Sequence, residues 1–293
     1  MTEPVLSVLT PTFRGGRFLP LALQSTQAAV AAGDVEHIVV DGGSEDGTVE
    51  LLERSHAVWH SAPDRGQSDA LNTALSMSRG RWVGWINCDE YYLSGALDSL
   101  VRTVRRIDAR SEPVDLVYGD YIEVTPDDQI LRLVAQHSPD VGVLRRFGLA
   151  LPSSTVVMRR SLVEQVGGWN VENRTMMDWE LWLSLLEAGA RFRYSGRAHT
   201  AFTRHDDQAS ARLAAIVEAE HQRLGAQFGI RAGRMRDAAT RARRVTRKAA
   251  NGSYRREVAF RSVVAGPAIA RDAAVLREPI PAGSPLRAFI LAD

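Results

Sequence analysis

The sequence is poor in the residues that build covalent or thiolate sites and in long apolar runs. Cys88 is the only cysteine, so an intramolecular disulfide is impossible and a structural zinc–thiolate site is not expected. No stretch of about 18 apolar residues occurs, which predicts no membrane-spanning helix. The chain leads directly into the apolar segment Val5–Leu9 without a basic region before it. We therefore expect no signal peptide and a cytoplasmic protein.

Charge is nearly balanced overall but not along the chain. The net charge is +1, so no global field selects nucleic acid or acidic substrates. The 293 residues suffice for one large domain or two small ones, and a hydrophobic content of 45% is ordinary for a globular protein. From Arg231 to Arg261, eleven Arg and Lys residues stand against Asp237 and Glu257. The C-terminal segment is therefore basic.

The first half of the sequence alternates apolar and amphipathic segments. Strands are expected at Val5–Thr10, Val35–Asp41, Val58–Ser61 and Trp82–Asn87. Helices are expected at Arg17–Ala32, from Asp46 to Arg54 with Ser44 and Asp46 as caps, at Gln67–Ser78 and at Ser94–Asp108. Repeated strand–helix units predict an α/β fold with a doubly wound, mostly parallel sheet, whose ligands lie beyond the carboxyl ends of the strands.

The second half is mixed. Val114–Val124 and Ile130–Ala135 are expected to pair around the turn Pro126–Asp128. Helices are expected at Asp140–Phe147, Arg160–Val166 and Asp178–Ala188, strands at Arg191–Tyr194 and Thr200–Thr203, and helical structure from Ala209 onward.

Polar residues follow each of the first four expected strands. The groups are Thr10-Pro11-Thr12-Phe13, Asp41-Gly42-Gly43-Ser44-Glu45-Asp46-Gly47-Thr48, Asp64-Arg65-Gly66 with Asn72 further on, and Asn87-Cys88-Asp89-Glu90. Acids at strand ends accept hydrogen bonds from ribose or base, glycines allow close backbone approach, and a carboxylate can hold a hard divalent ion. Each group alone is an ordinary turn signal.

Together, in this order, the groups resemble the family 2 glycosyltransferases of bacteria, over roughly Leu6 to Ser210. The resemblance implies a Rossmann-like GT-A fold, a nucleotide-sugar donor, Mg²⁺ or Mn²⁺, and inversion at the anomeric carbon. It also implies a nucleotide-sugar-binding half at 1–110 and an acceptor-binding, catalytic half at 111–230 of one domain. A helical basic extension at 231–293 follows.

By position, the resemblance implies a donor site and a metal site. The donor site comprises Thr10, Pro11, Thr12, Asp41, Asp64, Arg65, Gly66, Asn87, Cys88 and Arg204. Asn87-Cys88-Asp89 aligns with the family's Asp-x-Asp metal motif, with Asn in place of the first acid, so Asp89 is the expected ligand. One carboxylate fewer weakens attraction for the ion, and a bound donor is expected to complete the site.

On the acceptor side, Gly167-Gly168-Trp169-Asn170 and Met177-Asp178 resemble the family's second signature, in which Glu often precedes the Asp. Asp178 is the expected catalytic base, because an inverting transfer needs a group that takes the proton of the acceptor hydroxyl. The alternative is a first-turn acid that only stabilises its helix. Glu180 is the weaker candidate. Trp179 and Ser153 are expected to contact the acceptor, although Trp179 also suits a core position.

Arg204-His205, followed by residues up to Ser210, resembles the family segment that closes over the diphosphate. It implies that His205 ligates the metal and that Arg204 neutralises charge on the leaving group. The alternative is a solvated loop in which Ser210 caps the next helix.

The basic segment Arg231–Arg261 has two interpretations. It is either a solvated helical face or a surface for anionic lipid head groups, with Val245, Val258 and Phe260 toward the bilayer. The second interpretation places the cytoplasmic protein peripherally on the inner face of the membrane. RNA binding ranks low because few aromatic residues are interleaved with the basic ones.

The predicted function is metal-dependent, inverting hexosyl transfer from a nucleoside-diphosphate sugar, by default a UDP-sugar. The expected acceptor is a hydroxyl of a glycan or a lipid-linked precursor, in cell-envelope or capsular polysaccharide biosynthesis. A nucleotidyltransferase is an alternative, but a Gly-rich Gly-x-Gly-x-x-x-Arg motif is missing near the N-terminus. The other alternative is a catalytically silent scaffold that binds a nucleotide sugar. It is favoured by Asn87 and Met177, which stand where the family often has acids.

Overall fold

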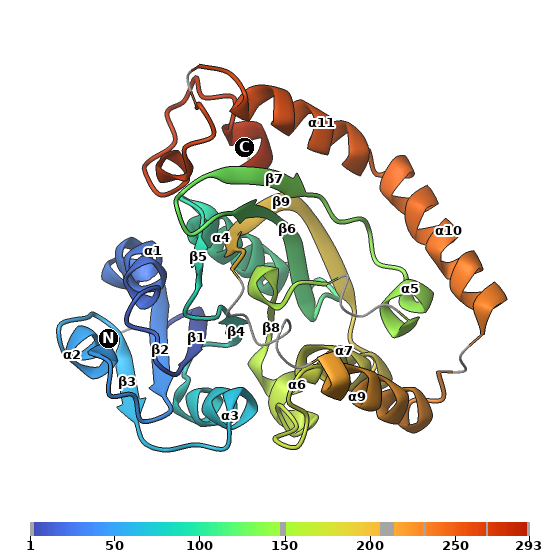
Figure 1. Cartoon of the computed structure of the whole chain (residues 1–293), viewed down its shortest axis with the longest axis horizontal. Coiled ribbons are helices and arrows are strands. Elements are labelled where there is room, and N and C mark those ends of the chain that lie inside the picture. Colours follow the sequence, from blue (N-terminus) through green and yellow to red (C-terminus); the bar gives the residue numbers. More distant parts are fainter. Residues whose placement is uncertain (1–2, 147–150, 206–213, 231–232, 268, 292–293) are drawn as a thin grey trace.

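The computed structural model describes residues 3–146, 151–205, 214–230, 233–267 and 269–291. Within them, nine strands form one sheet in the order β3-β2-β1-β4-β8-β6-β9-β5, with β7 paired to β6 (Figure 1). The strands are β1 Leu6–Thr12, β2 Val35–Asp41, β3 Val58–Ser61, β4 Trp82–Trp85, β5 Glu90–Tyr92, β6 Leu116–Val124, β7 Ile130–Val134, β8 Val157–Arg159 and β9 Phe192–Thr203.

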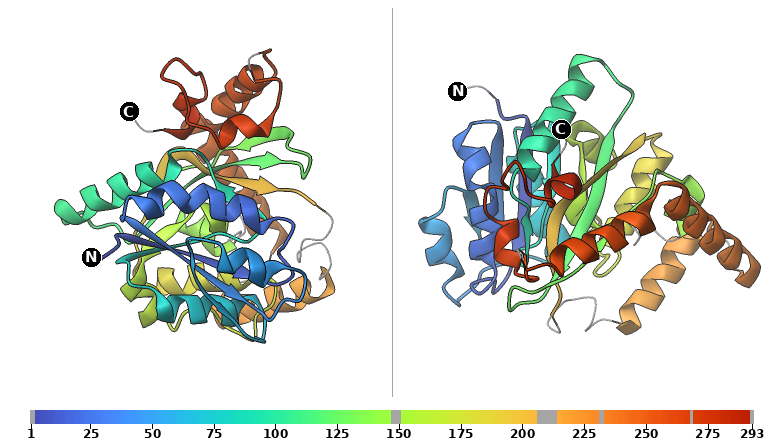
Figure 2. Two further views of the ribbon diagram at one scale, coloured as in Figure 1. Left: turned by 90° about the vertical axis from the view of Figure 1, so that its left-hand side faces the viewer. Right: turned by 90° about the horizontal axis from the view of Figure 1, so that it is seen from above.

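The first four strands are parallel and covered by helices on both faces. Leu6 and Val8 of β1 pack on the side of α1 Leu19–Ala31, α2 Thr48–Glu53 and α4 Ala96–Ala109. Leu9 points to the opposite side, toward α3 Gln67–Met77, α6 Arg160–Gln165 and α7 Met177–Glu187. This alternation follows from the two-residue period of a strand, and Figure 2 shows helices lying on both sides of the strands. The predicted doubly wound α/β architecture is confirmed.

The sheet is mixed beyond β4. Strand β8 is antiparallel to β4 and to β6, β9 is parallel to β6, and β5 is antiparallel to β9. The expected β6–β7 ribbon is confirmed, with Asp128 in the left-handed region at φ 57°. Two expectations were wrong. The segments Arg191–Tyr194 and Thr200–Thr203 are one strand with register shifts opposite 118–121, and β5 was not expected at all.

The expected capping of α2 was also wrong in part. Its N-cap is Gly47, which takes the left-handed conformation at φ 89°. The Ser44 hydroxyl instead donates to Asp41 Oδ1 at 2.5 Å, while Asp46 Oδ1 accepts from the backbone N–H and hydroxyl of Thr48. Asp46 therefore stabilises the first turn, and Ser44 stabilises the loop before it.

The C-terminal helices form an arc around β7, drawn from orange to red in Figure 1. They are α10 Arg234–Ala250, α11 Ser253–Val264 and α12 Arg287–Ile290, with a 3-10 turn at Ala273–Leu276. The preceding helix, α9 Ala214–Gln227, packs on α7 instead. Helix α11 packs on β7, and α10 packs on α5 Val141–Arg146. Phe260 is fully buried against Phe289, so the expectation that it faces a bilayer was wrong. No helix in the described ranges has the length and apolar character needed to cross a membrane.

One ion pair ties this arc to the sheet. Asp120 of β6 has no solvent exposure, and its carboxylate lies 2.7 Å from Arg256 of α11. Tyr194 donates its hydroxyl hydrogen to the same carboxylate at 2.6 Å, and the backbone N–H of Gln136 donates at 2.7 Å. Removing one partner of such a pair leaves a buried charge without compensation.

We therefore expect Arg256→Met to lower the free energy of unfolding by about 3 kcal/mol, measured by urea denaturation. The matched control is Arg255→Met, because Arg255 is the exposed neighbour on the same helix. The control is expected to change stability by less than about 0.5 kcal/mol. Equal unfolding midpoints for the two variants would show that the Asp120–Arg256 pair does not anchor the arc.

Candidate active site

The loops after the parallel strands meet at one edge of the sheet. The backbone N–H of Gly42 donates to the Thr12 carbonyl at 2.9 Å, and that of Ala62 donates to the Asp41 carbonyl at 3.0 Å. The N–H of Arg14 donates to the Ser44 hydroxyl at 2.7 Å. The expected grouping of polar residues at the carboxyl ends of β1, β2 and β3 is therefore present.

Asp41 shapes this edge from within. Its carboxylate is fully buried and accepts hydrogen bonds from the N–H groups of Gly43 and Ser44, at 3.1 and 2.8 Å. It also accepts from the hydroxyls of Ser44 and Ser61, at 2.5 and 2.7 Å. Four donors at one carboxylate hold the β2 and β3 loops in one arrangement.

The loop before α3 adds a second carboxylate. Burial raises the pKa of Asp64, and the nearby negative charges of Asp69 and Asp41 raise it further. A Cβ on Gly42 would lie only 3.1 Å from Asp64 Oδ2, so a larger residue would crowd this carboxyl group. Gly66, at φ 112°, donates its N–H to Asp64 Oδ1 at 2.8 Å. The side chain of Arg65 is exposed and pairs with Asp69 at 3.0 Å.

The residues of β1 divide between core and site. Thr10 was expected to line the donor pocket, but its buried hydroxyl lies 2.9 Å from His37 Nε2, so the side chain belongs to the core. Burial and the neighbouring His56 lower the pKa of His37 to about 3, which keeps that ring neutral. Pro11 is buried within the strand, and Thr12 is buried at its end.

Cys88 lies close to Thr12 and Gly15. A Cβ on Gly15 would lie 2.2 Å from the Thr12 hydroxyl oxygen and 3.4 Å from the Cys88 sulfur, which shows how closely the three residues pack. Burial, with a smaller contribution from the Asp89 charge, raises the pKa of the Cys88 thiol to about 12. The thiol is therefore protonated at neutral pH and is no nucleophile.

Asn87 bridges β4 and α3. Its side-chain oxygen accepts from Gln67 Nε2 at 2.5 Å and from Trp85 Nε1 at 3.0 Å. Its backbone N–H donates to Glu90 Oε2 at 2.8 Å. The amide that replaces the first acid of the expected metal motif therefore fixes the loop that presents Asp89.

Asp89 and His205 meet although 116 positions separate them. Asp89 Oδ2 lies 2.9 Å from His205 Nε2, and both side chains are largely buried. The His205 ring stacks on Phe18, with ring centroids 4.7 Å apart. The two expected metal ligands are thus brought together. In the described part of the chain, no group of three or more His, Cys, Asp or Glu residues is arranged to hold a metal.

Asp178 lies at the start of α7, and its Oδ1 accepts from the N–H of Trp179 at 2.7 Å. Burial raises the pKa of Asp178 to about 6. The pKa of the buried Glu90 is also raised, first by burial, then by the charge of Asp89 and, more weakly, by that of Asp178. The carboxyl group of Glu90 is therefore close enough to Asp89 and to Asp178 for the charge of each to raise its pKa.

Glu90 was absent from the predicted site, although it follows Asp89 directly. Its one sequence signal was a second acid after the strand, and only its burial in β5 reveals the interaction with Asp178. Phe18 gave no such signal. Glu180 accepts from Asn170, Asn173 and Arg223, at 3.0, 2.6 and 2.8 Å, which supports its weaker ranking as a base.

The acceptor-side expectations have mixed outcomes. Trp179 is 1% exposed, donates to the Leu144 carbonyl at 3.2 Å and stacks on His221. Its expected role as an acceptor platform was therefore wrong, because its ring is enclosed in the core. Ser153 is partly exposed in the 3-10 turn Ser153–Thr155. Met177, where the family often has Glu, is buried with its sulfur 3.2 Å from the Ser68 hydroxyl.

Arg204 is exposed, and its guanidinium pairs with Glu123 at 3.1 Å. Glu123 also pairs with Arg132 at 2.7 Å. Arg204 is therefore close to the expected site, because it directly precedes His205. Its positive charge is compensated by Glu123. The rest of that segment, including Ser210, lies outside the described residues.

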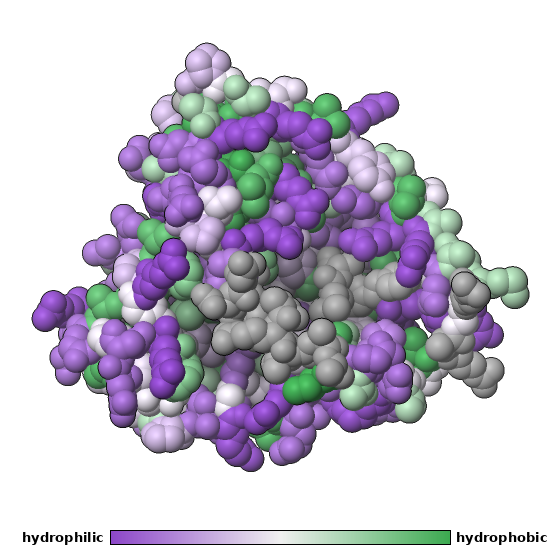
Figure 3. Space-filling view, viewed as in Figure 1, coloured by the Kyte–Doolittle hydropathy of each residue, from purple (hydrophilic) through white to green (hydrophobic). Residues whose placement is uncertain are grey.

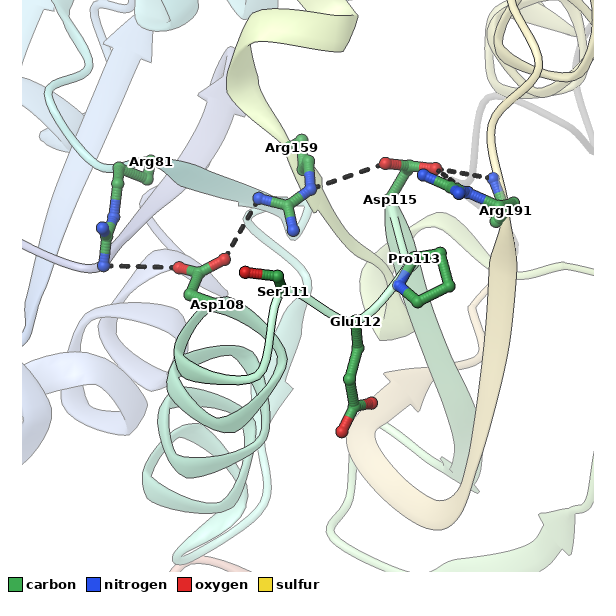
Figure 4. Close-up of a pocket in the computed structure, with 8 residues that line it drawn as sticks. All are labelled: Arg81, Asp108, Ser111, Glu112, Pro113, Asp115, Arg159 and Arg191. Carbon is green, nitrogen blue, oxygen red and sulfur yellow. Dashed lines mark hydrogen bonds and ion pairs between the residues drawn. The ribbon is translucent and has the colours of Figure 1, made fainter.

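A pocket of about 480 Å³ lies at the opposite end of the sheet (Figure 4). Its lining residues are Arg81, Asp108, Ser111, Glu112, Pro113, Asp115, Arg159 and Arg191. Asp108 pairs with Arg81 and Arg159 at 3.3 and 3.1 Å, and Asp115 pairs with Arg191 at 3.1 Å. These compensated charges surround the start of β4 and β6, whereas Asp89 lies beyond the end of β4, so the pocket is separate from the candidate site.

Comparison with known sequences finds similarity to glycosyltransferases. The profile of the family described as Glycosyl transferase family 2 matches residues 7–145. A PGL/p-HBAD biosynthesis glycosyltransferase of Mycobacterium tuberculosis is 28% identical over 186 residues, which cover 61% of this chain and 69% of the relative. An uncharacterized glycosyltransferase of the same species is 28% identical over 185 residues, covering 61% of this chain and 68% of the relative.

Solved structures share the fold. S. aureus TarS 1-349 in complex with UDP-GlcNAc superposes with a TM-score of 0.58 at 18% identity, covering 76% of this chain and 71% of TarS. The mannosyltransferase PcManGT from Pyrobaculum calidifontis, in complex with GDP-Man and Mn²⁺, gives 0.54 at 18% identity, covering 92% and 83%. The chain has the GT-A fold, and its sequence matches support a glycosyltransferase of family 2.

Proposed function

We propose that the protein is a metal-dependent, inverting glycosyltransferase. It moves a sugar from a nucleoside-diphosphate sugar to a hydroxyl group of a glycan or lipid-linked acceptor. The observation that carries this proposal is the meeting of Asp89 and His205 at 2.9 Å, beside the buried Glu90, whose pKa responds to the charges of Asp89 and Asp178. Such an arrangement offers a site for the leaving diphosphate next to a carboxylate of raised pKa.

The donor lies across the loops after β1, β2 and β3. Asp41 holds those loops in place, and the carboxyl group of Asp64 reaches the edge beside Gly42. TarS and PcManGT are known with UDP-GlcNAc and GDP-Man, which supports a nucleotide sugar as the ligand. A UDP-sugar is our default donor.

Asp89 Oδ2 and His205 Nε2 would hold the divalent ion. A carboxylate oxygen and an imidazole nitrogen suit Mn²⁺ or Mg²⁺, and donor phosphate oxygens would supply further ligands. The Nδ1 atom of His205 is buried without a hydrogen-bond partner in the described residues, so the ring is held by its contacts with Asp89 and Phe18. When bound, the ion stabilises negative charge on the leaving diphosphate. The Mn²⁺ in the PcManGT complex supports this assignment.

Asp178 is the base that removes the proton of the acceptor hydroxyl. Its raised pKa brings it closer to that of an efficient base at neutral pH, while the group stays mostly ionised there. The raised pKa of Glu90 keeps a larger fraction of that group protonated, which limits repulsion between the carboxyl groups. A hydroxyl held by Asp178 would attack the anomeric carbon from the side opposite the diphosphate, and this geometry gives inversion.

The acceptor belongs to the cell envelope in this proposal. The M. tuberculosis relative is named for PGL/p-HBAD biosynthesis, which supports a role in envelope glycans. Val245 and Val258 are 55% and 62% exposed among the basic residues of α10 and α11. They would let a cytoplasmic protein contact an anionic membrane peripherally.

We expect Asp178→Asn to lower kcat about 100-fold or more while donor affinity stays within about twofold, because general-base catalysis contributes at least that factor. In the wild type, ionised Asp178 is present above its pKa, so transfer should rise with pH through about 6 and then level off. Both are measured from nucleoside diphosphate released in the presence of acceptor. Asp98→Asn, which changes a first-turn acid of α4, is the matched control and should leave transfer unchanged. Transfer by Asp178→Asn within a few-fold of wild type would remove Asp178 from this role.

Asp89→Asn and His205→Gln are each expected to weaken Mn²⁺-dependent donor binding about tenfold or more, since each removes a ligand of the ion. Binding measured without metal should change little. Calorimetric titration with UDP-GlcNAc, GDP-Man and the free diphosphates, with and without Mn²⁺, measures both quantities and identifies the nucleotide. Asp127→Asn, an exposed acid in the β6–β7 turn, is the control. Titrations of Asp89→Asn that match the wild type with and without Mn²⁺ would contradict the metal assignment.

A further inference from the structure

A second pocket, of about 490 Å³, lies between α10 and the start of α11. Its lining residues are Arg241, Arg244, Val245, Lys248 and Tyr254. The first four follow the spacing i, i+3, i+4 and i+7, so they lie on one face of α10. Tyr254, in the first turn of α11, closes one side and is 40% exposed.

The neighbouring face of α10 is fixed by other residues. Arg243 and Arg247 contact the buried carboxylate of Asp140, at 2.8 and 3.5 Å. These pairs hold α10 against the segment that leads into α5. Residues outside the pocket therefore help to fix the orientation of the face of α10 that lines it.

The pocket carries positive charge that the protein compensates only in part. No acidic side chain is among the described residues that line it. Lys248 pairs with Glu257 at 2.7 Å, and Glu257 also accepts from the N–H of Ala135 at 3.0 Å. Within the described ranges, no ion pair joins Arg244 to an acid. A guanidinium group of this kind is available to an anionic ligand.

A series of contacts leads from the pocket toward the candidate active site. Glu257, which pairs with Lys248, accepts from the N–H of Ala135, the residue after β7. Glu123 pairs with both Arg132 of β7 and Arg204. Burial raises the pKa of Tyr121 to about 12, whereas the positive charges of Arg132, Arg204 and Arg244 lower it. These three arginines, from β7, the end of β9 and α10, are therefore near the same phenol. Arg204 directly precedes His205. Figure 3, viewed as Figure 1, shows many hydrophilic residues on the face between α10 and β7, with apolar residues among them.

We propose that this pocket binds a phosphate group carried by the acceptor, so the acceptor is a phosphorylated glycan or glycan precursor. The proposal rests on the proposed function, because it assigns the anionic partner of the same transfer site. The guanidinium group of Arg244, with the cationic side chains of Arg241 and Lys248 on the same helix face, matches the several oxygens and the charge of a phosphate better than a carboxylate. The exposed ring of Tyr254 offers a face for the sugar that carries the phosphate.

The test uses glycerol 3-phosphate as the probe, titrated calorimetrically into the full chain with UDP present to fill the donor site. Arg244→Gln is expected to weaken binding about tenfold, because one charge-assisted contact is lost. Arg255→Gln, an exposed arginine of α11 outside the pocket, is the matched control. Wild-type affinity for glycerol 3-phosphate should exceed that for acetate. Equal weakening by both variants would overturn the proposal, since it would indicate general surface charge.

A second measurement separates the source of the phosphate. Sedimentation with phosphatidylglycerol vesicles, against phosphatidylcholine vesicles, tests a lipid surface. Vesicle binding that depends on Arg244, together with no binding of glycerol 3-phosphate, would overturn the acceptor assignment in favour of the membrane. Glycerol 3-phosphate binding that depends on Arg244, with equal vesicle binding by wild type and Arg244→Gln, supports it.

Measurements on the donor separate the proposed function from the phosphate site. Donor binding and slow donor hydrolysis without acceptor report the proposed function and should be the same in wild type and Arg244→Gln. If the wild type bound no nucleotide-sugar donor, the proposed function would be refuted, whether or not glycerol 3-phosphate binds. Normal donor hydrolysis without Arg244-dependent phosphate binding would refute only the phosphate site. A thermal unfolding scan of each variant confirms that the fold is retained.

Discussion

The register of β9 between β6 and β5 is the constraint on which the site depends. Strand β9 runs parallel to β6 from Phe192 to Thr203, and on its other edge Phe202 pairs with Glu90. Because Asp89 precedes Glu90 and His205 follows β9 closely, this pairing sets the 2.9 Å contact between them. A slip of one residue would turn each side chain to the opposite face of the sheet and separate the two groups.

Burial then sets the chemistry of the acids at this edge. The same low-dielectric environment raises the pKa of Asp178 to about 6, raises that of Glu90 and keeps the Cys88 thiol protonated. Asp41 is equally buried but accepts four hydrogen bonds. Asp41 therefore fixes the loops after β2 and β3, whereas Asp178, which accepts a hydrogen bond from the N–H of Trp179, is the candidate base.

The basic C-terminal segment divides in a similar way. Arg243, Arg247 and Arg256 contact buried acids of the sheet layer or the segment before α5, so part of the positive charge holds the arc in place. Phe260 belongs to the core beneath β7. Arg244, in contrast, lines the pocket on α10. Counting charges along the segment does not separate these roles, since they depend on which face of each helix meets the sheet.

The sequence by itself determined the four parallel strands, the helices between them and the polar loops at their ends, because apolar periodicity and turn residues are local signals. It also determined the candidates Asp89, His205 and Asp178 through an ordered set of motifs. Only the tertiary structure decided that Trp179 and Phe260 are core residues, that Thr10 turns toward His37, and that Glu90 interacts with Asp178. Strand β5 and the continuity of β9 were also decided there. The physical reason is that burial and pairing depend on contacts between segments that are far apart in the chain, and local propensity contains no information about them.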